Sequence, residues 1–227
     1  MIKKLEIACF SKESAFIAAE AGADRIEFCS DYNSGGITPS VEDFRKVRKQ
    51  TGIPVYVMIR PRAGDFVYSP EEIFKMKSEI KLFSEEGADG FVFGVLNTDR
   101  TVNSEACFEL MNGAGKHPCT FHRAFDRCVD PMTAASRIIS CRFTSVLSSG
   151  MENSALQGAE LLKRLIDFTG GKLNVIAGGG VRSSNIEAVC RIAETEFYHS
   201  SGIVSGIDAN RSEIEKMKEI LRKCSTE

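Results

Sequence analysis

The sequence lacks the features that mark several large classes of protein. No run of basic residues is longer than a pair such as Lys3–Lys4, and 29 lysines and arginines face 31 acidic residues. The concentrated positive surface that binds nucleic acid is therefore not expected. No apolar run approaches the roughly 20 residues needed to cross a bilayer. Charges at Lys3, Lys4 and Glu6 interrupt the stretch where a signal peptide carries its apolar core. We expect a cytoplasmic protein that binds neither nucleic acid nor membrane.

Characteristic cysteine and glycine motifs are missing as well. None of the eight cysteines forms a Cys-x-x-Cys pair, so zinc-finger and dithiol redox sites are not indicated. Cysteines in a chain of this kind are usually reduced and packed as small apolar side chains. The glycine triplet Gly178–Gly180 follows a late strand rather than the first, and no Gly-x-Gly-x-x-Gly is present there. This placement disfavours a dinucleotide-binding sheet.

What the chain does contain is a repeated strand-then-helix pattern. Strands are predicted at 4–10, 24–29, 54–60, 89–95, 117–121, 143–147, 173–177 and 196–200. Helices are predicted at 11–21, from 40, from 70, at 103–113, 131–140, 155–168, from Ser184 with a capping box to Glu187, and at 213–222. Strict alternation without a linker predicts an α/β fold with residues 1–227 in a single (β/α)8 TIM barrel. A doubly wound open sheet is the alternative.

Polar residues near the strand ends predict a pocket at one end of this barrel. Side chains alternate inward and outward along barrel strands, and a carboxylate turned toward the helices would be buried without a partner. We therefore expect Glu6, Glu27, Arg60 and His122 to face the interior, with Asp126 in the polar stretch after the fifth strand. Carboxylates, an arginine and an imidazole around one cavity can perform acid–base chemistry. A structural ion network that fills the barrel is the alternative interpretation.

The loops after three strands predict an anion site. Arg62 lies in the loop after the third strand, while glycines and serines follow the seventh and eighth strands, where barrels commonly bind phosphate. The candidate anion-binding residues are Arg62, Gly178, Gly179, Gly180, Ser200 and Ser201. Tight turns that require positive φ are the alternative explanation for the glycines. The expected partner is a small phosphorylated or carboxylated molecule.

Several stretches of the sequence resemble the CutC copper-homeostasis family. They are Glu6–Cys9, Gly22–Cys29, Gly35–Ser40, Met58–Phe66, Thr120–Asp126, Ala177–Val181 and His199–Ser201. The resemblance implies a cytosolic (β/α)8 protein, often a homo-oligomer, that is linked to copper handling. Two departures are visible. Ser148-Ser149-Gly150 stands where Thr-Ser-Gly is usual, and the segment after Gly202 lacks the arginine-rich motif of many relatives.

Two cysteines are candidate copper ligands. Cys9 and Cys29 end neighbouring predicted strands, about 4.8 Å apart, and Cu(I) prefers thiolates. Cys128 is a candidate third ligand. The alternation of side chains along the strands argues against this site. Cys29 shares the inward face with Glu27, whereas Cys9 lies on the face opposite the inward Glu6, so the two thiols would point to opposite faces. Two hypotheses follow: a homeostasis protein that binds Cu(I), and a barrel enzyme with a Glu/Arg/His pocket for a small anion. A scaffold without either activity is the third.

Overall fold

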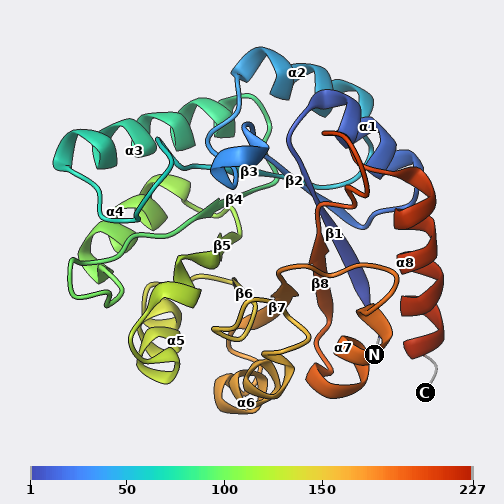
Figure 1. Ribbon diagram of the computed structural model, residues 1–227. Helices are drawn as coiled ribbons and strands as arrows, with labels where there is room; N and C mark the ends of the chain where they lie inside the picture. Colours follow the sequence, from blue (N-terminus) through green and yellow to red (C-terminus); the bar gives the residue numbers. More distant parts are fainter. Residues whose placement is uncertain (1, 226–227) are drawn as a thin grey trace.

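Eight parallel strands close into a barrel in chain order, with β8 paired back to β1 (Figure 1). This computed structural model describes residues 2–225, so residue 1 and residues 226–227 of the predicted domain lie outside the described range. The predicted (β/α)8 barrel is confirmed, and the open sheet is wrong. The strands are β1 Lys4–Cys9, β2 Arg25–Phe28, β3 Val55–Met58, β4 Gly90–Phe93, β5 Cys119–Phe121, β6 Ser145–Ser148, β7 Asn174–Gly178 and β8 Phe197–Ser200.

One α-helix follows each strand and covers the outside of the barrel (Figure 1). The helices are α1 Lys12–Glu20, α2 Val41–Gln50, α3 Pro70–Glu85, α4 Ser104–Ala114, α5 Pro131–Ser140, α6 Ala159–Thr169, α7 Ile186–Ala193 and α8 Arg211–Cys224. Two short 3-10 helices, η1 Tyr32–Ser34 and η2 Arg123–Arg127, lie in the loops after β2 and β5. Within residues 2–225, no helix combines the length and the apolar character needed to span a membrane.

Helix starts with clear local signals lie where the sequence places them. Ser11 and Ser40 accept hydrogen bonds from backbone N–H groups in the first turns of α1 and α2. Ser69 forms a complete capping box at α3. Asp130 caps α5 over a distance of 2.7 Å to the N–H of Thr133, with proline at the first helical position. These caps satisfy N–H groups that a helix end leaves unpaired.

One predicted helix start and one predicted capping box are wrong. The helix expected from residue 155 begins at Ala159, because Gly150 and Gly158 pack backbone against backbone. A Cβ on Gly150 would lie 2.1 Å from the carbonyl oxygen of Gly158. The capping box expected at Ser184 does not form either. Helix α7 begins after Asn185, whose side chain bonds the preceding loop instead.

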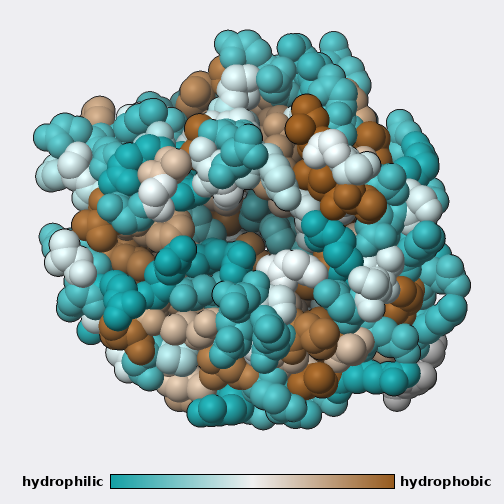
Figure 2. Space-filling model, in the orientation of Figure 1, coloured by the Kyte–Doolittle hydropathy of each residue, from teal (hydrophilic) through white to brown (hydrophobic). Residues whose placement is uncertain are grey.

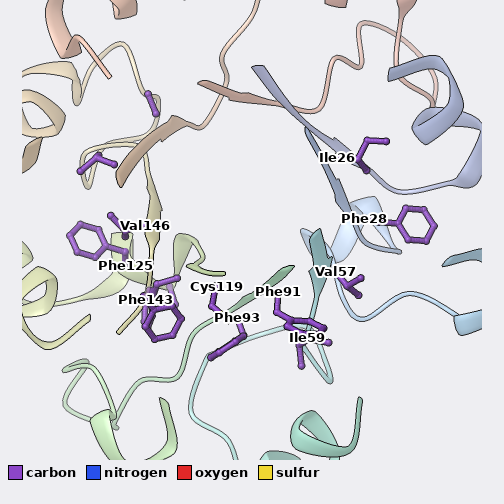
Figure 3. Packing of buried hydrophobic residues seen from close by; sticks show 14 of the residues in the cluster. Ile26, Phe28, Val57, Ile59, Phe91, Phe93, Cys119, Phe125, Phe143 and Val146 are labelled. Atoms are coloured by element: carbon purple, nitrogen blue, oxygen red, sulfur yellow. The ribbon is translucent and has the colours of Figure 1, made fainter. Parts of the chain in front are cut away.

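Side chains alternate along the strands between two buried layers. One set of positions, which includes Ile26, Phe28, Val57 and Ile59, packs outward in the main core against the helices (Figure 3). The intervening positions face the barrel interior, where Met58 belongs to a separate small cluster. Because a closed parallel barrel is covered by helices outside and filled by side chains inside, the polar residues on the inner positions are directed toward its axis.

Candidate active site at the barrel mouth

A cavity of about 110 Å³ lies at the carboxyl ends of the strands. Its polar lining consists of Glu27, Arg60, His122, Arg123 and His199, and its walls include Met58, Phe66 and Leu147. Figure 2 shows the hollow near the middle of this face, bordered mainly by hydrophilic residues. The structure thus brings three predicted site residues, Glu27, Arg60 and His122, to a single cavity.

Glu6 is a buried, ion-paired carboxylate beside this cavity. Strand pairing places it opposite both Arg25 of β2 and His199 of β8. Its fully buried carboxylate accepts hydrogen bonds from Arg25 Nε at 2.5 Å and from His199 Nδ1 at 2.7 Å. Burial opposes ionisation, but the charge of Arg25 and the hydrogen bond from His199 lower the pKa of Glu6 to about 2. Glu6 is therefore ionised, and it is not part of the cavity lining.

Glu27 lines the cavity without a hydrogen-bond partner for its Oε2 atom. Glu27 is buried, with only 3% of its surface exposed. Burial raises the pKa of Glu27 to about 7, and the charge of Glu6 adds to this effect, while His199 and Arg25 offset part of it. A carboxyl group whose pKa is near neutrality can both take and give a proton under physiological conditions. Glu27 is thus suited to act as an acid–base group.

His122 presents a neutral ring to the same cavity. It caps η2, where its Nδ1 atom accepts a hydrogen bond from the N–H of Ala124 at 3.3 Å. Burial and the neighbouring charge of Arg60 lower the pKa of His122 to about 3. A neutral imidazole that accepts at Nδ1 carries its proton on Nε2, and this Nε2 atom is buried without a partner. The ring offers one unused N–H donor.

Arg60 supplies positive charge at the wall of the cavity. Three of its five N–H donors bind the backbone carbonyls of Ser34, Gly36 and Gly64, at 2.8, 2.9 and 3.2 Å. Its guanidinium group stacks on Phe66, with the Cζ atom 4.9 Å from the ring centre. Among residues 2–225, no ion pair includes Arg60. The cation is fixed in place by uncharged groups, so its charge is available to an anion in the cavity.

Arg123 is the second cation at the mouth, and Asp126 holds it. The Asp126 carboxylate accepts from Arg123 Nε at 2.8 Å and from the hydroxyls of Ser148 and Ser149 at 2.6 and 3.0 Å. Asp126 was expected among the catalytic residues, but it lies behind Arg123 and does not line the cavity. This arrangement makes Asp126 a positioning residue for Arg123 and for the loop after β6.

Two glycines of the triplet, Gly178 and Gly179, serve close packing at this point. Gly178 ends β7, and a Cβ there would lie 2.5 Å from Leu147 Cδ1. Gly179 has φ +111°, and its Cβ would lie 2.9 Å from Ser149 and 3.4 Å from Arg123. The absence of side chains at these positions leaves room for groups that border the cavity.

The other predicted anion-binding residues lie apart from the cavity lining. Arg62 pairs with Glu72 at 2.6 Å on the outer side of the loop after β3. The hydroxyls of Ser200 and Ser201 accept hydrogen bonds from the guanidinium group of Arg182, at 3.0 and 3.1 Å. Arg182 therefore links the loop after β7 to the end of β8.

The candidate copper ligands are buried on different sides of the sheet. Cys9 packs in the main core and donates to the carbonyl of Ile7, whereas Cys29 belongs to the inner cluster and donates to the carbonyl of Cys9. Burial and the charge of Glu27 raise the pKa of both thiols well above the usual value. Cys128 is buried elsewhere, with its pKa raised to about 12 by burial. As arranged, these thiols do not fit a two-thiolate Cu(I) site.

One other group of described residues has the composition of a metal site. Glu6, Glu27 and His199 each offer a ligand atom, and these atoms lie within 4.8 Å of one another. However, both oxygens of Glu6 already accept hydrogen bonds, one of them from the Arg25 cation. A metal ion would have to compete with these partners.

Three residues of the site were not among the predicted ones: Arg25, Arg123 and His199. Arg25 shares the inward face of β2 with Glu27, so alternation carried a signal for it. His199 is 193 positions from its partner Glu6, and only the closure of the barrel brings the two together.

The fold and the cavity together define a TIM-barrel protein with a polar site at the carboxyl end of its strands, the usual place for barrel sites. The model of the CutC family matches residues 3–204. The human copper homeostasis protein cutC homolog is 44% identical over 197 residues, which cover 87% of this chain and 72% of that protein. A CutC family protein of Treponema denticola is 38% identical over 200 residues, 88% of this chain and 81% of that protein.

A solved structure of a family member supports the same assignment. The copper homeostasis protein CutC of Streptococcus agalactiae superposes with a TM-score of 0.83 at 27% identity, covering 88% of this chain and 99% of that one. This chain therefore belongs to the CutC family, and the resemblance found in its motifs is confirmed.

Proposed function

We propose that this protein binds a small anionic metabolite in the cavity at the barrel mouth and uses Glu27 for acid–base chemistry on it. The observation that carries the proposal is a pair of buried polar atoms without partners, Glu27 Oε2 and His122 Nε2, on two residues that line the same cavity. Leaving a buried polar group unsatisfied costs about 1–3 kcal/mol. A purely structural network would satisfy such groups, whereas a binding site leaves them for its ligand.

Charge supports an anion as the ligand. Arg60 and Arg123 border the cavity, and the carboxylate of Glu6 is already neutralised by Arg25. Charge-assisted hydrogen bonds from guanidinium groups to carboxylates or phosphates are stronger than those between neutral groups.

A thermal-shift titration with small carboxylates and phosphates tests this proposal. A ligand at about 100 times its Kd stabilises the folded state by roughly 2.7 kcal/mol, which raises the melting temperature measurably. Arg123→Ala is expected to abolish the shift. Arg127→Ala is the matched control, because Arg127 lies exposed on the same turn η2 and outside the cavity lining. Absence of any anion-induced shift, or an equal loss in both variants, would contradict the proposal.

A Cu(I) site at Cys9 and Cys29 is the second candidate function. It is supported by the copper-homeostasis names of the relatives and by the short approach of Cys29 Sγ to the Cys9 carbonyl, 3.5 Å. Binding in this way requires Cys9 to turn inward and both thiols to lose their protons, because the thiolate is the ligand.

Titration of the reduced protein with Cu(I) against a competing chelator tests the second candidate. The Cys9→Ser, Cys29→Ser double variant is expected to lose affinity, and Cys224→Ser serves as the control, since Cys224 is half-buried on α8. Unchanged affinity in the double variant would eliminate these ligands.

We also propose that the protein is a cytoplasmic homo-oligomer, as its resemblance to the family implies. Large apolar side chains on neighbouring helices, Phe74 of α3 and Phe108 of α4, are exposed and would be covered in such an assembly. Light scattering of the purified protein and fractionation of cells test these two points.

A further inference from the structure

The cavity pairs an acceptor with a donor, each buried and each unused. Glu27 and His122 are both 3% exposed. Glu27 Oε2 and His122 Nε2 have no hydrogen-bond partner among the described residues. One group takes a proton and the other donates a hydrogen bond from a neutral ring, so the two can act at different atoms of one ligand.

We propose that the pocket catalyses enolisation of a small 2-oxo carboxylate. In this inference, which rests on the proposed function, Glu27 removes a proton from the carbon beside the carbonyl. His122 donates its Nε2–H to the carbonyl oxygen, and the carboxylate of the substrate pairs with Arg60 and Arg123.

The step balances without any further reactant. The C–H bond at the carbon next to the carbonyl breaks, and its proton forms an O–H bond with the carboxylate of Glu27. The electron pair of that bond forms a carbon–carbon double bond, while the carbonyl π electrons move to oxygen. The resulting enolate oxygen accepts the hydrogen bond of His122. Return of the proton from Glu27 restores the 2-oxo acid, and a proton exchanged with solvent leaves a label on carbon.

The environment of each group matches its role. A neutral imidazole polarises a carbonyl without placing a full positive charge beside the cation of Arg60. The capping bond from Ala124 N–H to Nδ1 fixes the ring so that Nε2 carries the hydrogen. Phe66 packs against that ring at a tilt of 59°, with 4.8 Å between the ring centres. Met58 contributes an apolar side chain to the lining that also contains Glu27. Apolar surroundings strengthen electrostatic interactions because they exclude water from the site.

Size favours a small carboxylate over the larger sugar phosphates. A water-sized atom needs roughly 10–15 Å³ of cavity space, so the 110 Å³ present hold about seven to eleven non-hydrogen atoms. Small 2-oxo acids do not exceed this number, whereas phosphorylated sugars of four or more carbons do.

Exchange of hydrogen for deuterium tests the inference. The protein is incubated in deuterated buffer with pyruvate, 2-oxobutanoate or 2-oxoglutarate, and proton NMR follows the signal at carbon 3. Wild-type protein is expected to accelerate loss of this signal over buffer. Glu27→Gln is expected to slow it by about 10²–10⁴-fold, the range for a positioned base. His122→Gln is expected to slow it while still binding the acid, and Arg127→Ala is expected to match wild type.

The outcomes separate this inference from the proposed function. If 2-oxo acids raise the melting temperature but no exchange above buffer occurs, enolisation is wrong and the binding proposal stands. If exchange persists unchanged in Glu27→Gln, the assignment of the base is wrong. If no anion binds at all, both proposals fail. Circular dichroism shows whether each variant is folded, and Glu27→Asp, which keeps the charge but withdraws it by one methylene, provides a second variant with partial activity expected.

Discussion

Replacement of Glu27 by glutamine removes an ionisable group from a buried site that disfavours its charged form. The pKa of Glu27 is about 7 in the folded protein against an ordinary value of 4.5, because the carboxyl is buried. The folded state therefore holds the proton more tightly than the unfolded state. The contribution of Glu27 to stability is fully present below pH 4.5 and is lost as the pH rises through about 7. At about 1.4 kcal/mol per pH unit, the loss amounts to about 3 kcal/mol.

Urea unfolding of wild type and Glu27→Gln, monitored by circular dichroism from pH 4 to pH 8, measures this effect. The free energy of unfolding of the variant relative to wild type is expected to rise by about 3 kcal/mol across this interval and then level off. The exposed Glu42 of α2 provides the matched control, and Glu42→Gln is expected to leave the difference flat. A difference for Glu27→Gln that varies by less than about 0.5 kcal/mol would refute the claim that this carboxyl is desolvated and unpaired.

Three further substitutions test other parts of the site and fold by urea unfolding. His122→Gln is expected to gain about 5 kcal/mol over wild type as the pH falls from 6.5 toward 3, because the folded-state pKa of His122 is lowered to about 3; a pH-independent difference contradicts this. Glu6→Gln is expected to lose about 3–5 kcal/mol by leaving buried Arg25 unpaired, and adding Arg25→Met should recover part of it. Gly150→Ala is expected to lose about 1–3 kcal/mol more than Gly170→Ala, since both have positive φ but only Gly150 meets backbone atoms.

Much of the fold was predictable because its signals are local. Helix α5 runs from Pro131 to Ser140 as predicted, since Asp130 supplies the cap and proline begins the helix. Alternation along single strands likewise placed Glu27 and Arg60 on inner positions, because one buried carboxylate on the wrong face has no partner.

Features that depend on distant segments were not predictable in this way. The start of α6 depends on the contact of Gly150 with Gly158, which a helical pattern over residues 155–168 does not reveal. Arg62 and Arg60 are neighbours in sequence, yet only Arg60 lines the cavity, because Glu72 on α3 holds Arg62 outside. In each case the decisive partner lies outside the local pattern.

The pairing of β8 with β1 means that completion of the ring and assembly of the site are one event. Glu6 and His199 meet across this seam, and a seam that opened would expose the Glu6 carboxylate to water and remove one of its two partners. A molecule that contacts both Glu27 of β2 and His199 of β8 would therefore bridge these strands across β1 and oppose opening of the seam. We therefore expect the free energy needed to open the barrel at this seam to increase as more of the protein carries a ligand at its mouth.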